Sequence, residues 1–312
     1  MTLAAGIILV VGVGVVMRVR QQRKNFIWHF ETLESLLKLR AYDHPLIGEC
    51  LGDYRVIGVL EGDGQAGHLR AVPDRSLDLS KSVAVEVRWF GSSGDKERRE
   101  FDRESELLAR MRHANIAAVH GWGFEPQWYR VVDLVEGQTL DDWRHAEQSI
   151  LAALDVSLQV LDALAFAHSC GVMHHNLCPR CISVQRGKVK LREFGRPLVP
   201  IHLAHPTDLG LPSYMSPEMI SASGGQLDGA TDQYGAGCII CELLTGQPPY
   251  PSGDVMQVLM GHLSQPAPSL RERRPELSAE LDSAVRKMLE KRPEDRYPDL
   301  ASAAAAIRRC LP

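Results

Sequence analysis

The sequence lacks a large excess of charge of either sign. Its 312 residues include 35 Lys and Arg against 39 Asp and Glu, which leaves a formal net charge of −4. A sequence-wide electrostatic attraction to nucleic acid is therefore excluded, and we expect no nucleic-acid partner. Low-complexity stretches and internal repeats are also lacking, and 45% of the residues are hydrophobic. Intrinsic disorder and fibrous folds are excluded as well.

Cysteine is present, but without the spacing of a disulfide framework. The seven cysteines lie at positions 50, 170, 178, 181, 238, 241 and 310. A chain of this length buries enough apolar surface to fold without disulfide bonds. We therefore expect free thiols in a reducing compartment.

Residues 1–17 contain no charged side chain, and four basic residues follow within 18–24. This pattern is typical of a membrane span followed by a basic stop. Seventeen helical residues extend roughly 25 Å, slightly less than the roughly 30 Å hydrocarbon core of a bilayer. A cleaved signal peptide would carry its positive charge before the apolar run instead. We predict a single-pass transmembrane helix at 1–17, with the rest of the chain in the cytoplasm by the positive-inside rule.

The residues after this anchor predict a connector and then two lobes. Residues 18–50 contain the basic stop and a juxtamembrane connector. Short β-rich runs predominate at 51–135, and helical patterns predominate at 136–310. The expected fold class is therefore α+β, with a small β-rich lobe followed by a larger helical lobe.

Two helices of the larger lobe have clear signals. One amphipathic helix is marked by four side chains on a single face: Leu154, Leu158, Leu161 and Ala165. Residues 231–244 are apolar nearly all round, which indicates a buried helix, and Gly and Pro residues at 246–249 end it. Cys238 and Cys241 fall on this helix and are expected to pack in the core.

A series of short motifs runs through nearly all of the chain from 54 to 308. The motifs are MRHANI at 111–116, DLVEGQTL at 133–140, HHNLCPRCI at 174–182, EFG at 193–195 and GLPSYMSPE at 210–218. In this order and spacing they resemble the protein kinase superfamily, and the chain is most similar to bacterial serine/threonine kinases of the eukaryotic type. The resemblance implies a bilobal kinase fold, and it implies ATP and Mg²⁺ as the cofactors of an active member.

The resemblance assigns a role to each motif, and the small-lobe positions depart from it. Glu86 takes the place of the lysine that holds the α- and β-phosphates, in the register set by Ala84. Glu104 matches the helix glutamate that pairs with that lysine, so two carboxylates would face each other. At about 4 Å and an effective dielectric near 20, this repulsion is about 4 kcal/mol. We expect the helix to swing outward, one carboxyl to take up a proton, or Arg70 or Arg88 to intervene.

The catalytic-loop positions depart further. Asn176 takes the place of the catalytic aspartate, and an amide cannot act as a base near neutral pH. Cys178 replaces the lysine that neutralises the transferring phosphoryl group. Cys181 replaces an asparagine that binds Mg²⁺, a hard ion that prefers oxygen ligands. Glu193 replaces the metal-binding aspartate and is the conservative change of the set, because it adds one methylene and keeps the charge.

The glycine-rich loop is ambiguous. Gly62, Gly64 and Gly67 match the literal pattern G-x-G-x-x-G. The register of the neighbouring residues, however, places none of them at the family's three glycine positions, and a literal match is weak evidence. In the same register His68 takes the place of the valine above the adenine.

Residues that hold the kinase fold together are retained, in contrast to the catalytic ones. His174 and Phe194 match members of the family's regulatory spine. Glu218 and Arg296 match the pair that ties the activation segment to the last helices. Asp232 matches the helix aspartate that braces the catalytic loop. The resemblance thus implies a degenerate member, with the fold kept and the chemistry removed.

Three functions follow. The first is a membrane-anchored pseudokinase without a cofactor, a cytoplasmic regulatory or scaffolding module that binds a protein partner such as another kinase or its substrate. The alternative is an unconventional active kinase that uses ATP and Mg²⁺, with Arg70 or Arg88 replacing the lysine and Glu193 holding the metal. The third is a thiol or zinc sensor built on Cys178 and Cys181.

Overall fold

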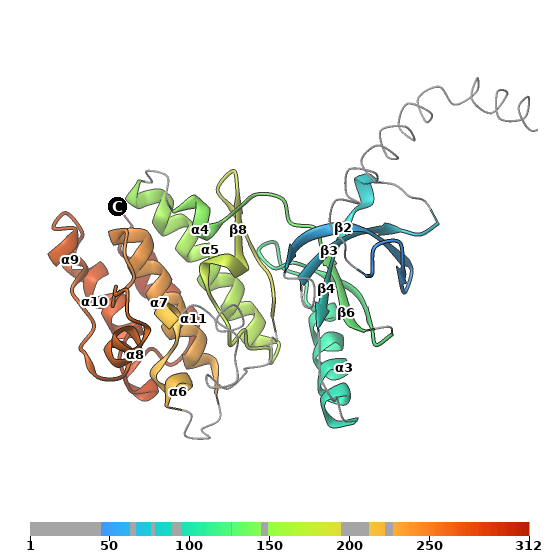
Figure 1. The fold of residues 1–312 in the computed structure, drawn as a ribbon. Coiled ribbons are helices and arrows are strands. Elements are labelled where there is room, and N and C mark those ends of the chain that lie inside the picture. The colour runs from blue at the N-terminus through green and yellow to red at the C-terminus, as the bar shows by residue number, and fades with distance from the viewer. Residues whose placement is uncertain are drawn as a thin grey trace, which may run out of the picture. The chain divides into compact units, whose positions relative to one another are not determined.

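The computed structural model describes residues 45–62, 67–75, 79–88, 95–125, 127–144, 149–194, 212–221 and 227–311. The predicted membrane span and most of the connector lie outside these residues. The chain divides into two compact units, one within Met1–Gly91 and Trp122–Val131, the other within Ser92–Gly121 and Val132–Pro312 (Figure 1). A β-rich part followed by a helical part is the arrangement expected from the sequence.

A six-stranded sheet, in the order β1-β2-β3-β4-β6-β5, carries the β-rich part. Its strands are β1 (Cys50–Leu51), β2 (Tyr54–Gly62), β3 (Gly67–Pro73), β4 (Val83–Arg88), β5 (Val119–Gly123) and β6 (Trp128–Asp133). A 3₁₀ turn, η1 (Leu79–Lys81), precedes β4. Strands β2, β3 and β4 pair antiparallel in sequence order.

Side chains alternate along β4 as its sequence predicts. Val83, Val85 and Val87 are buried in the hydrophobic core cluster of the smaller unit. Ala84 and Glu86 fall between them, and successive side chains of a strand point to opposite faces. Ala84 and Glu86 therefore lie on one face of β4, opposite the face that carries the three valines.

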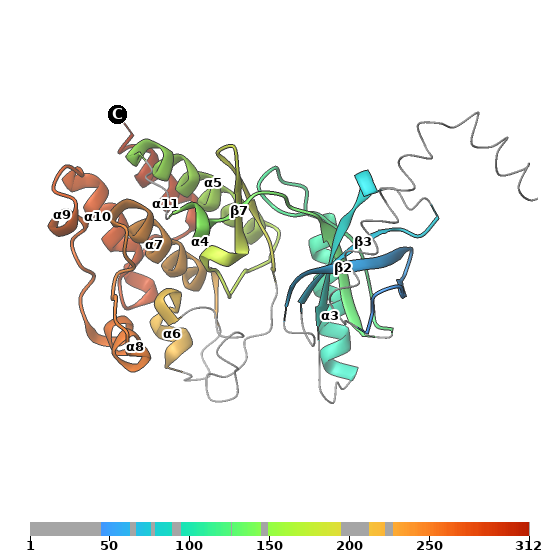
Figure 2. The ribbon, with the colours of Figure 1, turned by 45° about the horizontal axis from the view of Figure 1, so that its top comes forward.

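The larger unit is mainly helical (Figure 2). Its helices are α3 (Asp95–Arg110), α4 (Leu140–Trp143), α5 (Ile150–Ser169), α6 (Pro217–Ile220), α7 (Gly229–Thr245), α8 (Val255–Ser264), α9 (Leu270–Arg273), α10 (Ala279–Met288) and α11 (Leu300–Arg308). Three short strands form a second sheet, β7 (Gln138–Thr139), β8 (Ile182–Gln185) and β9 (Lys188–Leu191). The described part of this unit also contains the 3₁₀ turns η2 (Pro179–Cys181), η3 (Pro212–Tyr214) and η4 (Pro293–Asp295).

Helix α7 is buried along nearly its whole length, as its apolar sequence predicts. Asp228 caps its amino end, where the side chain accepts a hydrogen bond of 2.9 Å from the backbone N–H of Ala230. Gly246 ends the helix with φ at 78°, in the left-handed region that a glycine adopts without strain. Cys238 and Cys241 are both buried on this helix, so the prediction that they pack in the core is confirmed.

Among the described residues, α5 is the one helix long and apolar enough to cross a membrane. Its predicted apolar face, including Leu154, Leu158 and Leu161, is buried in the core of the larger unit. Core helices of soluble domains pass the same length and composition test, so α5 is a core helix.

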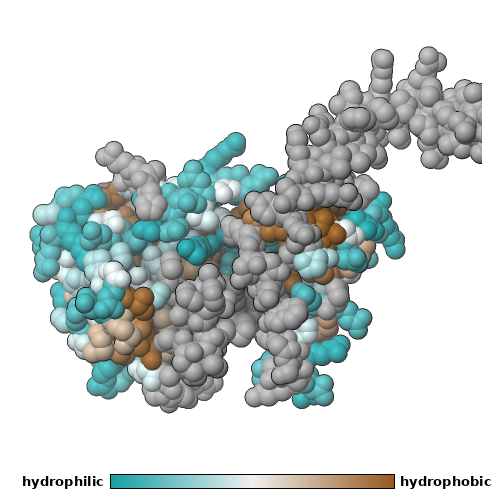
Figure 3. Space-filling model, viewed as in Figure 1, coloured by the Kyte–Doolittle hydropathy of each residue, from teal (hydrophilic) through white to brown (hydrophobic). Residues whose placement is uncertain are grey.

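Apolar side chains gather at one place on the surface of the larger unit. Figure 3 shows this patch where Figure 1 places α8. Val255, Met256 and Met260 of that helix are each at least half exposed. Most of the other large apolar side chains described in this unit are buried.

Candidate functional site

The catalytic loop between α5 and η2 is held mainly through its backbone. Asp232 of α7 is buried, and its carboxylate accepts hydrogen bonds of 2.7 Å from the backbone N–H groups of His174 and His175. The ring of His168 contributes a third contact, 2.7 Å from Nε2 to Oδ2. Burial alone would raise the pKa of Asp232, but the bond to His168, the nearby His174 and the backbone bond outweigh burial and lower it. The predicted bracing role of Asp232 is confirmed.

His174 is buried at the start of the loop. Its Nε2 atom lies 2.9 Å from the backbone oxygen of Arg192, and its ring packs on Phe194 with centroids 4.7 Å apart. Burial lowers the pKa of His174, so the ring stays neutral at pH 7. The contact between His174 and Phe194 that the resemblance implies is present.

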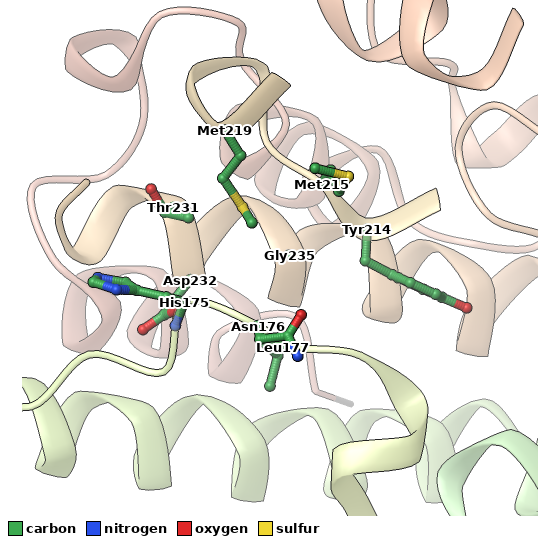
Figure 4. Close-up of a pocket in the computed structure, with 9 residues that line it drawn as sticks. All are labelled: His175, Asn176, Leu177, Tyr214, Met215, Met219, Thr231, Asp232 and Gly235. Carbon is green, nitrogen blue, oxygen red and sulfur yellow. The ribbon is translucent and has the colours of Figure 1, made fainter. Parts of the chain in front are cut away.

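Asn176 lies beside a small cavity in the larger unit. Loop residues 175–177, residues of η3 and α6, and helix α7 line this cavity. In Figure 4, Asn176 lies between the ring of His175 on one side and Tyr214 on the other, and the side chain of Met219 points toward the loop. The open volume is about 10 Å³, room for about one water molecule.

The sulfur atoms of Cys178 and Cys181 lie in contact, 3.4 Å apart. Cys178 directly precedes η2, and the backbone N–H of Cys181 donates to the oxygen of Cys178 at 3.0 Å. The sulfur of Cys181 also lies 3.5 Å from the backbone oxygen of Asn176 and 3.9 Å from Oε2 of Glu193. The hydrogen bond from Cys181 lowers the pKa of Cys178. Four of the predicted site residues are thus brought together.

Two residues of this site have a strained backbone. His175 and Glu193 have φ values of 61° and 65°, in the left-handed region that non-glycine residues seldom adopt. Such conformations persist where surrounding contacts fix the backbone, and they cluster at functional sites. The carboxylate carried by this backbone at Glu193 lies 3.9 Å from the sulfur of Cys181.

Within the smaller unit, Glu86 has His68 as a neighbour. The two residues are cross-strand partners on β4 and β3, and His68 Nε2 lies 3.9 Å from Glu86 Oε1. Arg70 instead pairs with Ala84, and its Nε atom donates to Ser82 at 3.2 Å. The structure thus brings His68, rather than Arg70, to the charge of Glu86.

Other predicted residues of the nucleotide site are only partly described. Gly62 and Gly67 are cross-strand partners at the ends of β2 and β3, and Gly64 lies outside the described residues. Glu104 lies on α3, in the larger unit. The side chain of Arg88 is likewise outside the description. Glu86 and Glu104 lie in different units, and the predicted repulsion between them remains a prediction.

Glu218 and Arg296 form the ion pair that the resemblance implies. The guanidinium donates two bonds to the carboxylate, at 2.8 and 2.9 Å, and the side chain of Arg296 is fully buried. It also lies over the ring of Tyr234, 4.9 Å from the centroid. Burial would raise the pKa of Glu218, and the bonds from Arg296 outweigh it and lower that pKa. This prediction is confirmed.

A second buried network was missed by sequence reasoning. The Tyr214 hydroxyl donates to the carboxylate of Glu242, which also accepts from Arg144. Arg144 donates in turn to Asp141, at 2.6 Å from Nη2. Burial raises the pKa of Glu242 despite these bonds. A glutamate, Glu242, within the apolar sequence of α7 was the available signal.

The zinc hypothesis gains no support in the described part of the chain. No three His, Cys, Asp or Glu side chains lie there in an arrangement that could hold a metal ion. Structural zinc sites use four ligands. The contact between the sulfur atoms of Cys178 and Cys181 is consistent with the other form of that hypothesis, a thiol sensor.

Comparisons with known proteins agree with the motifs and the fold. The family model "Protein kinase domain" matches residues 59–307. Serine/threonine-protein kinase PrkC of Bacillus subtilis is 29% identical over 272 residues, covering 84% of this chain and 41% of its own length. PknJ of Mycobacterium tuberculosis is 33% identical over 275 residues, covering 83% and 46%. PknB of the same species is 30% identical over 273 residues, covering 83% and 43%.

The match extends through both parts of the fold, because residues 59–307 include strands of the six-stranded sheet and the helices up to α11. The chain spans less than half the length of these curated relatives. Family model, relatives and bilobal element order agree with one another. The chain therefore belongs to the protein kinase family and resembles its bacterial serine/threonine kinases of the eukaryotic type.

Proposed function

We propose that this chain is a pseudokinase, a kinase fold that acts as a regulatory or scaffolding module by binding a protein partner. The contact between Cys178 and Cys181 carries this proposal, since two thiols stand where phosphoryl transfer needs a lysine and a metal ligand. The sulfur atoms lie 3.4 Å apart and are buried. Asn176, beside them, has no group that can accept a proton near neutral pH.

The side chains at the metal positions do not fit Mg²⁺. Magnesium requires near-octahedral oxygen ligands at about 2.0 to 2.1 Å. Glu193 offers oxygen, but the other position offers the sulfur of Cys181, 3.9 Å from Oε2 of Glu193. A soft thiol next to the carboxylate is a poor donor set for a hard ion.

The phosphate position is equally unsuited. Glu86 presents a carboxylate where ATP requires a cation, and it is largely buried. His68 at 3.9 Å is a neighbour that can balance this charge when protonated. A buried carboxylate repels the phosphates of ATP, and in low dielectric this repulsion is large. We therefore propose that the chain uses neither ATP nor Mg²⁺.

An unconventional active kinase is the second candidate. Its support is that the relatives are named serine/threonine-protein kinases, and that Glu193 keeps an acidic group on a strained backbone. Positioning supplies much of the catalysis in phosphoryl transfer, so weak activity needs few groups. This candidate requires Glu193 to bind Mg²⁺ together with ATP.

Nucleotide binding separates the two candidates. The full chain, purified in detergent micelles, is melted with and without millimolar ATP and Mg²⁺. Micromolar affinity would stabilise the native state by about 4 kcal/mol and raise the melting temperature by several degrees. We expect no shift. A saturable shift that Glu193→Ala abolishes would refute the pseudokinase proposal and favour the active kinase.

A matched gain-of-function variant controls this experiment. It restores the family residues at five positions: Glu86→Lys, Asn176→Asp, Cys178→Lys, Cys181→Asn and Glu193→Asp. This variant should gain the shift that the native chain lacks, because its donor set fits ATP and Mg²⁺. PknB, assayed in parallel, reports whether the conditions detect nucleotide binding by a kinase domain.

We also propose that residues 1–17 anchor the module in the membrane, with residues 18–24 and the kinase domain on the cytoplasmic side. The support is the uncharged run followed by four basic residues. The full-length protein should resist extraction by carbonate and by high salt. Release by either treatment would argue against a span, and digestion of the domain by protease outside intact cells would argue against this orientation.

A further inference from the structure

The strongest unassigned feature of the molecule is the thiol pair in the catalytic loop. Cys178 and Cys181 are 6% and 1% exposed, and their sulfur atoms lie 3.4 Å apart. A disulfide bond requires about 2.0 Å between sulfur atoms, so closure needs a movement of about 1.4 Å, within reach of side-chain rotation. Only two residues, Pro179 and Arg180, separate the cysteines.

The backbone already holds the two cysteines in a closed turn. The N–H of Cys181 donates to the oxygen of Cys178 at 3.0 Å, which forms the single turn of η2. Little further loop-closure entropy is therefore lost when the sulfur atoms join. Cys178 is the more exposed of the two sulfur-bearing residues, and Cys181 makes the additional contacts to Asn176 and Glu193.

A second Cys-x-x-Cys in the chain lacks these features. Cys238 and Cys241 lie within the regular helix α7, and the sulfur of Cys241 donates to the backbone oxygen of Gln247 at 3.8 Å. Burial raises the pKa of Cys241 to about 11, against an ordinary value of 9.0. That leaves about a hundredfold less thiolate than an unperturbed cysteine has. This pair is a built-in control with the same spacing and similar burial.

We propose that Cys178 and Cys181 are a redox modification site, which hydrogen peroxide converts reversibly into an intramolecular disulfide. A small neutral oxidant suits the site because both sulfur atoms are buried. The proposal rests on the geometry of the two cysteines and holds whether or not the chain binds nucleotide.

The chemistry balances in two steps. The sulfur of Cys178 attacks one oxygen of hydrogen peroxide, the O–O bond breaks, and the products are a sulfenic acid and one water molecule. The sulfur of Cys181 then attacks that of Cys178, the S–O bond breaks, and the leaving hydroxide takes the proton of Cys181 as a second water. The two thiols lose two electrons and two protons in total, and the peroxide is reduced to two water molecules. A dithiol such as dithiothreitol reverses the change by thiol–disulfide exchange.

Oxidation would alter the site around the pair. The thiol of Cys181 donates to the backbone oxygen of Asn176 and lies next to Oε2 of Glu193. A disulfide sulfur carries no hydrogen, so the backbone oxygen of Asn176 loses this donor. The carboxylate of Glu193, whose backbone is strained at φ of 65°, then lies beside a sulfur that cannot donate. The disulfide therefore couples the redox state of the pair to the contacts of Asn176 in the loop and of Glu193 after β9.

The experiment uses the full-length chain, reduced, in detergent micelles. Hydrogen peroxide is added, the reaction is quenched with acid, and free thiols are blocked with light N-ethylmaleimide. Reduction and heavy N-ethylmaleimide then label the cysteines that were oxidised reversibly, and peptide mass spectrometry assigns them. We expect heavy label on Cys178 and Cys181 together, at a rate roughly tenfold above that of Cys241, because the higher nucleophilicity of a high-pKa thiolate offsets part of its smaller fraction, with full recovery after dithiothreitol.

Two single variants test the assignment, so the test does not depend on the folding of one variant alone. Cys178→Ser should abolish the heavy label on Cys181, because its partner is gone. Cys238→Ser alters the control pair by the same substitution and should leave the label on Cys178 and Cys181 unchanged. Melting temperatures measured for each variant show whether it is folded.

Several results would overturn the proposal. Cys178 and Cys181 could stay reduced while the exposed Cys50 or Cys170 is oxidised. Glutathione disulfide could oxidise the pair faster than hydrogen peroxide does, which would contradict the assigned oxidant. A zinc ion bound in one-to-one ratio to the purified chain and lost in Cys178→Ser would identify a metal site in place of a redox site.

Discussion

Replacing Asp232 by asparagine should destabilise the larger unit by an amount that follows from three hydrogen bonds. Oδ1 accepts from the N–H of His175, and Oδ2 accepts from the N–H of His174 and from His168. Asparagine has one oxygen, so its NH₂ group meets at least one of these donors. An unsatisfied buried donor costs about 1 to 3 kcal/mol.

The loss of charge adds to that cost. Hydrogen bonds to an ionised group contribute about 1.5 to 3 kcal/mol, against about 0.5 to 1.5 for neutral ones. Two bonds to Asp232 that become neutral therefore lose about 1 kcal/mol each. Together with the unsatisfied donor, Asp232→Asn should cost about 3 to 5 kcal/mol, the range found when one partner of a buried ion pair is removed. That is a large part of the roughly 5 to 15 kcal/mol that stabilises a domain.

Urea unfolding, followed by tryptophan fluorescence, measures this cost. Asp162→Asn is the matched control, because Asp162 forms an ion pair with Arg308 at 2.9 Å while both side chains are about half exposed. Exposed pairs contribute about 0 to 1 kcal/mol. If the two substitutions cost the same within about 1 kcal/mol, the bracing argument for Asp232 is wrong.

Three other outcomes are expected. Burial, with Lys291 nearby, lowers the pKa of His262 to about 4, and the unfolded state therefore binds more protons between about pH 6.5 and 4. The free energy of unfolding should therefore fall by about 2 kcal/mol from pH 7 to 5 because of His262. Urea unfolding of His262→Gln should show a smaller fall, since only the contribution of His174 remains. A fall as large as that of the native chain would contradict the role of His262. Tyr214→Phe removes a hydrogen-bond donor from the buried carboxylate of Glu242 and should lower the free energy of unfolding by about 1 to 3 kcal/mol. An unchanged melting temperature would show that the hydrogen bond from Tyr214 to Glu242 does not stabilise the fold. Glu86→Lys should yield no substrate phosphorylation in a radiolabel assay, because the catalytic loop is unchanged; measurable transfer would show that Glu86 alone had prevented catalysis.

Sequence reasoning succeeded where the signal is local or fixed by motif spacing. The alternation along β4 follows from the period of a strand and appears in the burial of Val83 and Val85. The end of α7 at Gly246 follows from the conformation that a glycine permits. Asp232 and the bonds from Arg296 to Glu218 follow from family motifs whose spacing in the chain is retained.

The neighbour of Glu86 could not be derived in the same way. Arg70 and His68 lie on the same face of β3, and the pairing register decides which of them is opposite Glu86. That register depends on the connection between β3 and β4, and no pattern in the sequence indicates the conformation of that connection. The network of Tyr214, Glu242 and Arg144 was missed for a related reason, since these residues are 28 and 98 positions apart and show no shared periodicity.

The way the catalytic loop is held explains how its chemistry can change while its fold persists. Asp232 binds the backbone N–H groups of His174 and His175, and the turn of η2 is closed by backbone atoms of Cys178 and Cys181. Main-chain contacts of this kind do not depend on side-chain identity. Asn176 and the two cysteines can therefore replace polar catalytic groups without opening the loop, whereas a change at Asp232 removes the contacts that shape it.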